Sequence, residues 1–95
     1  MKSKIEETLV ILQEECAEVI QAASKILRFG FQSRYPTEDS ASTKECLEME
    51  AGQLLCMIGL LVEQGAIDED NMIAAMEHKK IKLKEWSSIL NADNT

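Results

Sequence analysis

The run LLCMIGLLV at residues 54–62 constrains the fold more than any other feature of the sequence. It belongs to a helical pattern that begins near Ser42 or Thr43 and ends at Gly65, and within it apolar side chains point in nearly every direction around the axis. A helix that is apolar on all sides has to be covered on all sides, which two neighbouring helices of a short chain do not easily achieve. We therefore expect a homo-oligomer, a dimer or a tetramer, that completes a helical bundle.

Another helix is predicted over residues 3–29. Ser3 suits the N-cap position, Glu6 three residues later completes a capping box, and Gly30 is a natural stop. At about 100° per residue, apolar side chains of one arc recur every three or four positions. The predicted arc consists of Ile5, Leu9, Leu12, Cys16, Val19, Ala23 and Ile26. We expect this arc to be the buried face of the helix.

The last helix is predicted to follow the acidic cluster at residues 68–70, whose negative charge suits a helix N-terminus. The pattern continues through Trp86 to about Leu90. Its apolar stripe consists of Met72, Met76, Leu83 and Leu90. The last five residues, 91–95, predict a flexible tail.

Residues 30–42, GFQSRYPTEDSAS, predict a loop between the first two helices. Loops of this length are uncommon unless they have a function, such as covering a site, and disorder is the other explanation. The sequence does not decide between the two. Residues 1–95 as a whole predict a single all-α domain, an antiparallel bundle of three main helices completed by oligomerisation.

Charge and composition exclude several classes of function. The formal net charge is −7, and a strongly acidic chain lacks the basic face that nucleic acid polymers require. The longest apolar run is far shorter than the ~20 residues of a membrane span, and no signal peptide is predicted. Cys16, Cys46 and Cys56 form no CxxC pair, as expected for reduced thiols. We therefore expect a cytoplasmic protein that binds neither a membrane nor a nucleic acid polymer.

Glu50 fits its predicted surroundings least well. It falls near the centre of the apolar face of the second helix, with Gln53 at the edge of that face. A buried carboxylate is costly unless it is paired, protonated or bound to a metal. Two partners are available. One is Lys79, which interrupts the apolar stripe of the last helix, and the other is a cation shared with Glu15 and Glu18, which emerge on one face of the first helix.

A shared cation explains more of the sequence than an ion pair does. Carboxylates that face one another inside a bundle repel unless a divalent ion lies among them, and oxygen ligands favour Mg²⁺ or Mn²⁺. Lys79 and Lys82 then have a role as well, since they would hold the phosphates that complete the coordination of the metal. Alone, Glu15 and Glu18 are weak evidence, because acids three apart on an exposed helix face are common.

Three segments, LQEECAEVIQAASKILRFG, LEMEAGQLLCMIGLLVEQG and EHKKIKLKEW, together resemble a known family. It is the MazG-like branch of the all-α nucleoside triphosphate pyrophosphohydrolases, and the resemblance covers the chain from about Leu9 to Trp86. The family pattern is EExxE on one helix and ExxD on the next. The first half is present here as Glu14-Glu15-x-x-Glu18, and the SKxxRFG and KxxK segments strengthen the resemblance.

The resemblance implies magnesium-dependent hydrolysis of a nucleoside triphosphate to a monophosphate and pyrophosphate, in a dimer or a tetramer. It implies Glu15, Glu18 and Glu50 as magnesium ligands, and Gln53 stands where the family has an Asp ligand. A Gln carbonyl can ligate a hard cation, but it supplies no charge and cannot act as a base. Glu14 or Glu18 would position the attacking water. The implied phosphate-binding residues are Lys25, Arg28, Lys79 and Lys82.

Two other functions fit the same residues. The departure at Gln53 is consistent with a relative that binds nucleotide and metal without turnover. Alternatively, Glu50 pairs with Lys79 in a helical interaction module that binds no ligand. Magnesium-dependent nucleotide binding without hydrolysis would indicate the first, and no stabilisation by magnesium plus nucleotide would indicate the second.

Overall fold

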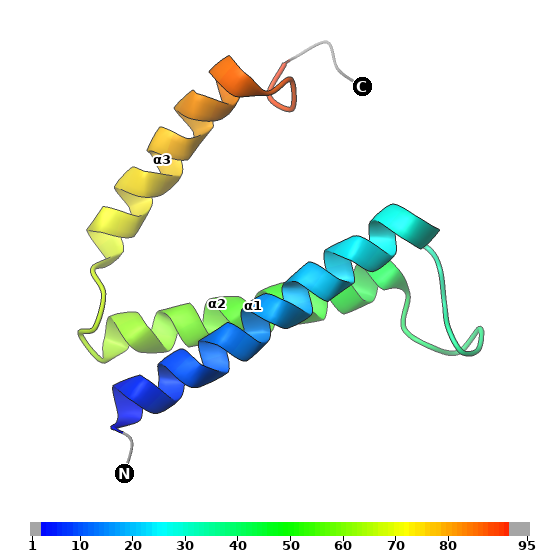
Figure 1. Ribbon diagram of the computed structural model, residues 1–95, viewed down its shortest axis with the longest axis horizontal. Coiled ribbons are helices and arrows are strands. Elements are labelled where there is room, and N and C mark those ends of the chain that lie inside the picture. Colours follow the sequence, from blue (N-terminus) through cyan, green and yellow to red (C-terminus); the bar gives the residue numbers. More distant parts are fainter. Residues whose placement is uncertain (1–2, 92–95) are drawn as a thin grey trace.

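The computed structural model describes residues 3–91, and helices form most of this part of the chain (Figure 1). They are α1 (Lys4–Phe29), α2 (Thr43–Glu63) and α3 (Glu69–Trp86). The only extended pairing among the described residues is an isolated antiparallel bridge between Arg34 and Ser42. The prediction of an all-α fold with three main helices is therefore confirmed. Of the predicted tail, residues 92–95 lie outside the described residues.

Capping boxes begin the first two helices. Ser3 Oγ accepts a hydrogen bond from the Glu6 backbone N–H at 3.1 Å, and Glu6 Oε1 accepts one from the Ser3 N–H at 3.2 Å. Ser42 and Glu45 repeat the arrangement at the start of α2, at 3.1 and 2.9 Å. Each box satisfies two backbone donors that lack a helical partner. α1 ends at Gly30, whose φ of 84° favours glycine, so both predicted ends of α1 are confirmed.

α3 begins at Glu69, inside the acidic cluster that it was predicted to follow, and ends one turn early. Asp68 caps it by accepting a backbone hydrogen bond at 3.0 Å. Trp86 is the last helical residue, because Ser87 takes an extended conformation and its hydroxyl accepts a hydrogen bond from the Ile89 N–H at 3.2 Å. A serine side chain that bonds the backbone in this way competes with continuation of the helix. The predicted helix end at about Leu90 is therefore wrong.

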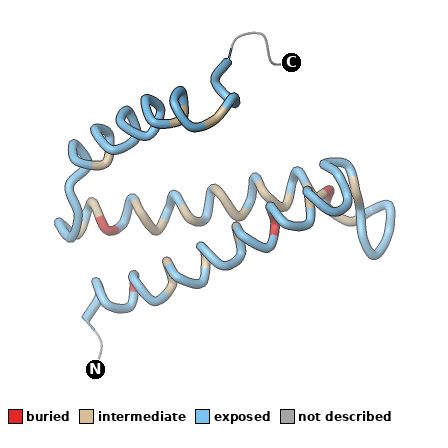
Figure 2. The backbone as a smooth tube through the Cα atoms, turned by 45° about the horizontal axis from the view of Figure 1, so that its top comes forward, coloured by how far each residue is buried: buried red, intermediate tan, exposed pale blue. Residues whose placement is uncertain are grey.

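α1 and α2 form an antiparallel hairpin, and α3 leads away from it. Figure 1 shows α3 diverging from the end of α2, and Figure 2 shows the same separation from another direction. Near the connecting turn, residues of α2 and α3 line one hollow, with Ile58 and Val62 on α2 and Met72 and Met76 on α3. The structure measures 42 × 38 × 15 Å, so it is flat and open. The single chain does not close into a three-helix bundle.

The face that α1 presents to α2 is turned relative to the predicted arc. Its buried and half-buried side chains are Thr8, Ile11, Leu12, Glu15, Val19, Ala22 and Ile26. The predicted arc therefore contributes only part of this face. The remaining arc residues are exposed, and they are Ile5, Leu9, Cys16 and Ala23. The physical reason is that the apolar surface of α1 is wider than one neighbouring helix can cover.

Much apolar surface remains uncovered. Leu61, 2% exposed, and Ala22, 6% exposed, are the only fully buried apolar side chains among residues 3–91. Within the apolar run of α2, Leu55 and Leu60 are exposed, and no residue of α3 is buried. Large exposed apolar patches mark interaction surfaces. None of the helices described is long and apolar enough to cross a membrane.

Candidate functional site

Glu50 lies where the sequence predicts it, on the side of α2 that faces α1. Along that face Leu47, Leu54 and Met57 are half-buried and Leu61 is fully buried. Glu50 itself is half-buried, and its Oε2 atom is buried without a hydrogen-bond partner. A carboxylate oxygen in this state costs free energy, because it has lost contact with water and has gained no donor.

Glu15 is the corresponding acid on α1. It is half-buried on the face toward α2, and its Oε2 atom also lacks a hydrogen-bond partner. Glu18, one turn further along α1, is exposed and lines a hollow of about 130 Å³ together with Glu50. We call this the carboxylate hollow, and its other lining residues are Gln21, Ala22, Lys25, Cys46 and Met49. Acids of both helices therefore meet at one place in the hairpin.

The electrostatics of Glu50 reflect this meeting. Burial raises the pKa of the Glu50 carboxyl above its ordinary value, and the negative charges of Glu18 and Glu15 raise it further. The raised pKa means that the folded protein keeps the Glu50 proton to a higher pH than the unfolded chain does. A divalent cation would favour the ionised form instead and would give the unpartnered oxygens a ligand role.

The acids are chemically suited to bind a divalent cation, but their carboxylates do not converge on one point. The unpartnered oxygens of Glu15 and Glu50, with Glu18 beside them, are of the ligand type that Mg²⁺ prefers. Even so, no three His, Cys, Asp or Glu side chains among the residues that the structure describes form a group that could hold an ion as they stand. Binding a cation would require the carboxylates to turn toward one another.

Two predicted site residues stand apart from these acids. Gln53 and Glu14 are both exposed, and neither lines the carboxylate hollow. Gln53 follows Glu50 by three residues, which rotates it by about 60° around the axis of α2. This rotation places Gln53 beyond the edge of the face toward α1, where it is exposed. The sequence predicts it at the edge of that face.

The lysines of α3 lie away from the carboxylates. Two of them, Lys79 and Lys82, line a hollow of about 240 Å³ together with Leu83 and Trp86, and we call it the α3 hollow. Within residues 3–91 the only ion pair joins Arg34 to Glu45, at 3.1 Å. The alternative in which Lys79 neutralises Glu50 is therefore not realised in the single chain.

Folded structure, not disorder, characterises the loop at residues 30–42. Arg34 Nη1 donates to the carbonyl oxygen of Ser40 at 2.7 Å and to Glu45 Oε1 at 3.1 Å. Hydrogen bonds from Ser42 and the charge of Arg34 lower the pKa of the Glu45 carboxyl, so Glu45 is ionised near neutral pH. The loop is thus tied to the start of α2, and disorder is wrong as an explanation of its length.

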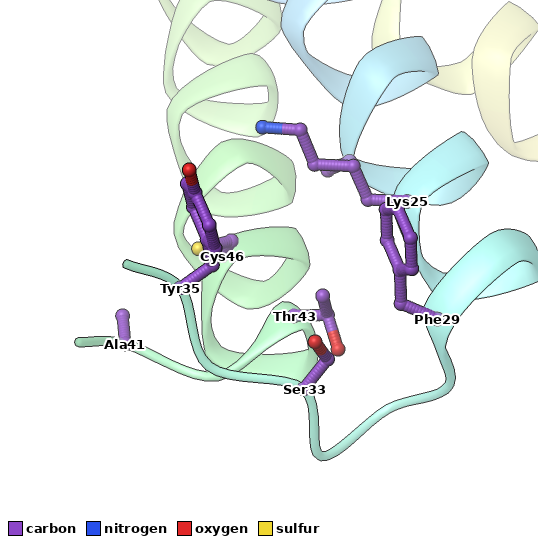
Figure 3. A pocket seen from close by; sticks show the side chains of 8 residues that line it. Lys25, Phe29, Ser33, Tyr35, Ala41, Thr43 and Cys46 are labelled. Atoms are coloured by element: carbon purple, nitrogen blue, oxygen red, sulfur yellow. The ribbon is translucent and has the colours of Figure 1, made fainter. Parts of the chain in front are cut away.

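Beside the carboxylate hollow lies a second one, which the sequence does not predict. We call it the loop pocket, and its volume is about 290 Å³ (Figure 3). Its lining includes Lys25, Phe29, Ser33, Tyr35 and Cys46, from α1, the loop and α2. The sequence offers two signals, the length of the loop, which favours a function such as covering a site, and the single Tyr that lies in it. The pocket itself depends on how the loop folds back, which local patterns do not specify.

Lys25 and Arg28, the predicted basic pair of α1, have different surroundings. Lys25 lines both the carboxylate hollow and the loop pocket. Arg28 lines neither, and its guanidinium carbon lies 5.0 Å from the centre of the Phe29 ring. Lys25 is therefore the better placed of the two to contact a ligand.

Comparison with known proteins adds no relative. No family model, curated protein or solved structure matches the chain. The function has to be argued from the side chains of this chain: the acids of α1 and α2, Lys25 between the two hollows, and the lysines of α3.

Proposed function

We propose that this protein hydrolyses a nucleoside triphosphate to a monophosphate and pyrophosphate with the help of magnesium. The observation that carries the proposal is the meeting of Glu15, Glu18 and Glu50, with two buried oxygens that lack partners. The fold alone gives no reason to keep acids at the contact between two helices, because like charges there destabilise it. A phosphate-bound cation gives a reason, and the resemblance of the helices to the MazG-like pyrophosphohydrolases supplies the reaction.

Each acid has a role in this proposal. Glu15, Glu18 and Glu50 would hold the ion, which when bound neutralises charge on the phosphate oxygens. Glu18 lines the carboxylate hollow and Glu14 does not, so Glu18 is the better candidate to orient the water that attacks in line. Lys25, which lines the carboxylate hollow, would contact a phosphate oxygen there.

A homo-oligomer is part of the proposal, and in it α3 of one copy covers the hairpin of another. The exposed apolar side chains of all three helices support this, since a well-packed second copy would bury them. Charge supports it too. Residues 79–86 carry four Lys and one Glu, whereas α1 and α2 together carry nine Glu and four cationic side chains. The arrangement would bring Lys79 and Lys82 to the phosphates held by the acids of the partner.

Pyrophosphate release from each common nucleoside triphosphate, with magnesium and with a chelator, tests the proposal. We expect release from at least one nucleotide with magnesium and none with the chelator. Magnesium-dependent nucleotide binding without release would instead show a protein that binds and does not turn over. An unchanged melting temperature in the presence of magnesium plus nucleotide would indicate the interaction module.

The binding protein is the second candidate because Gln53 is uncharged and exposed. If the site is a weakened version of the family site, Gln53→Asp should tighten magnesium binding and raise turnover by about fivefold, because one fully solvated charge pair about 4 Å apart contributes about 1 kcal/mol. The matched control is Gln13→Asp, which adds the same charge at an exposed position of α1 and should change neither quantity. Magnesium titration and initial rates measure both variants. A fall in activity on Gln53→Asp would show that Gln53 suits the substrate and is no lesion.

A further inference from the structure

We propose that the loop pocket binds the nucleoside part of the substrate, with the base between Phe29 and Tyr35. This inference rests on the proposed function and assigns a place to the half of the substrate that the acids do not contact. Figure 3 shows the two rings on opposite sides of the pocket, Phe29 at the end of α1 and Tyr35 on the loop. Planar bases stack on aromatic side chains of this kind, whatever pattern of hydrogen-bond donors and acceptors the base carries.

The position of the pocket suits a substrate that continues into the carboxylate hollow. Lys25, Ala22 and Cys46 line both spaces, so the two share a wall. The Lys25 side chain extends from α1 toward α2 across this junction (Figure 3). A nucleotide with its base in the loop pocket would thus present its phosphates to Lys25 and then to Glu18 and Glu50.

The volumes of the two spaces agree with this assignment of base and phosphates. The loop pocket, at about 290 Å³, is close to the lower end of the ~300–1,000 Å³ range of small-molecule sites. The carboxylate hollow, at about 130 Å³, is less than half that size and bears the charged groups. Of the two, the loop pocket is the one that can enclose a ring system.

Neither aromatic ring is needed by the fold. Tyr35 is 87% exposed and Phe29 is 61% exposed, so neither contributes much to the core. The loop next to Tyr35 is nevertheless tethered, because the neighbouring Arg34 bonds Ser40 and Glu45. An exposed aromatic side chain on a tethered loop can contact a ligand without a large ordering cost.

The test compares ligands with and without a nucleoside. The probes are α,β-methylene analogues of ATP, GTP, CTP and UTP, and inorganic tripolyphosphate, each with magnesium and measured by calorimetry. For the analogue that binds tightest, Tyr35→Ala and Phe29→Ala should each raise the Kd by about 5- to 100-fold, the usual effect of losing one stacking partner. The Kd of tripolyphosphate should stay within about twofold, because no ring touches the phosphates.

Controls separate this effect from misfolding. Phe31→Ala removes another exposed aromatic side chain of the same loop that does not line the pocket, so it should leave every Kd unchanged. Tyr35→Phe should retain binding because it keeps the ring. The ring protons of Tyr35, the only Tyr of the chain, should also shift in the NMR spectrum when the analogue binds and not when tripolyphosphate binds.

The outcomes distinguish this inference from the function on which it rests. If tripolyphosphate binds and the analogues bind no better, or if the alanine variants bind them as the parent protein does, the loop pocket is not the nucleoside site and the magnesium–phosphate site stands. If neither tripolyphosphate nor any analogue binds, the proposed function fails and this inference fails with it.

Discussion

Glu50→Gln is expected to abolish both hydrolysis and the stabilisation of the protein by magnesium. Loss of a residue that merely supports a metal ligand typically costs 10- to 100-fold in affinity or activity, so loss of a ligand should cost more than about 100-fold in kcat/KM. In the parent protein, magnesium at ten times its Kd should raise the Tm by roughly 5–10 °C. In the variant the Tm should not respond. Thermal melts with and without magnesium, together with pyrophosphate release, measure both effects.

The same variant should be more stable than the parent protein when no metal is present. The pKa of Glu50 is raised in the folded state by burial and by Glu18 and Glu15, so the folded protein holds this proton more tightly than the unfolded chain does. Stability therefore falls as the pH rises from the ordinary Glu pKa of about 4.5 through the raised value. Gln does not ionise, so the Tm difference between variant and parent should be small below pH 4.5 and grow above it.

Glu48→Gln is the matched control. Glu48 lies two residues away on the same helix and is exposed, so the change removes the same charge outside the face toward α1. It should leave the magnesium response and the activity in place. If Glu50→Gln keeps a full magnesium response, Glu50 is no ligand and the acids do not form a metal site.

The ends of α1 could be predicted because capping is a local interaction. Ser3 and Glu6 bond each other's backbone within one turn, and Gly30 supplies a conformation that few other residues adopt. The predicted end of α3 was wrong for an equally local reason. The Ser87 hydroxyl accepts a backbone hydrogen bond at a point where the helix was predicted to continue. Sequence patterns show that a serine can do this but not where it does.

The buried face of α1 shows where periodicity stops being sufficient. Cys16 and Glu15 are adjacent in sequence, and the predicted buried arc includes Cys16. The structure places Glu15 toward α2 and leaves Cys16 exposed. Since apolar side chains cover more of α1 than α2 can bury, the packing chooses which part is covered. On α2 the position of Glu50, on the face toward α1, was predicted correctly.

Hollows were harder to predict than helices. Lys25 and Tyr35 are ten residues apart and lie on different elements. Hydrogen bonds between the loop and the start of α2, among them the one from Arg34 to Glu45, bring the loop back over the helix ends. The separation of α3 from the hairpin could not be predicted from the sequence either, because the apolar stripe of α3 does not specify whether the helix packs on its own chain or on another.

Two variants that each lose most of their activity should restore activity to one another if α3 acts on the hairpin of a second copy. Glu50→Gln removes an acid, and Lys82→Ala removes a phosphate contact. A charged hydrogen bond contributes roughly 1.5–3 kcal/mol, so Lys82→Ala should lower kcat/KM by about 10- to 100-fold. Its Tm should change little, because Lys82 is exposed. The control Lys80→Ala removes a neighbouring exposed lysine that does not line the α3 hollow and should keep activity.

In a mixed dimer of the two variants, one site combines both defects and the other has neither. The intact site takes its acids from the Lys82→Ala chain and its lysines from the Glu50→Gln chain. When equal amounts are unfolded together and refolded, half of the dimers are mixed, so about a quarter of all sites should be intact and about a quarter of the parent activity should return. If each chain instead used its own α3, both sites of a mixed dimer would carry one defect. The mixture would then be no more active than the mean of the two variants, and light scattering would show whether the chains associate at all.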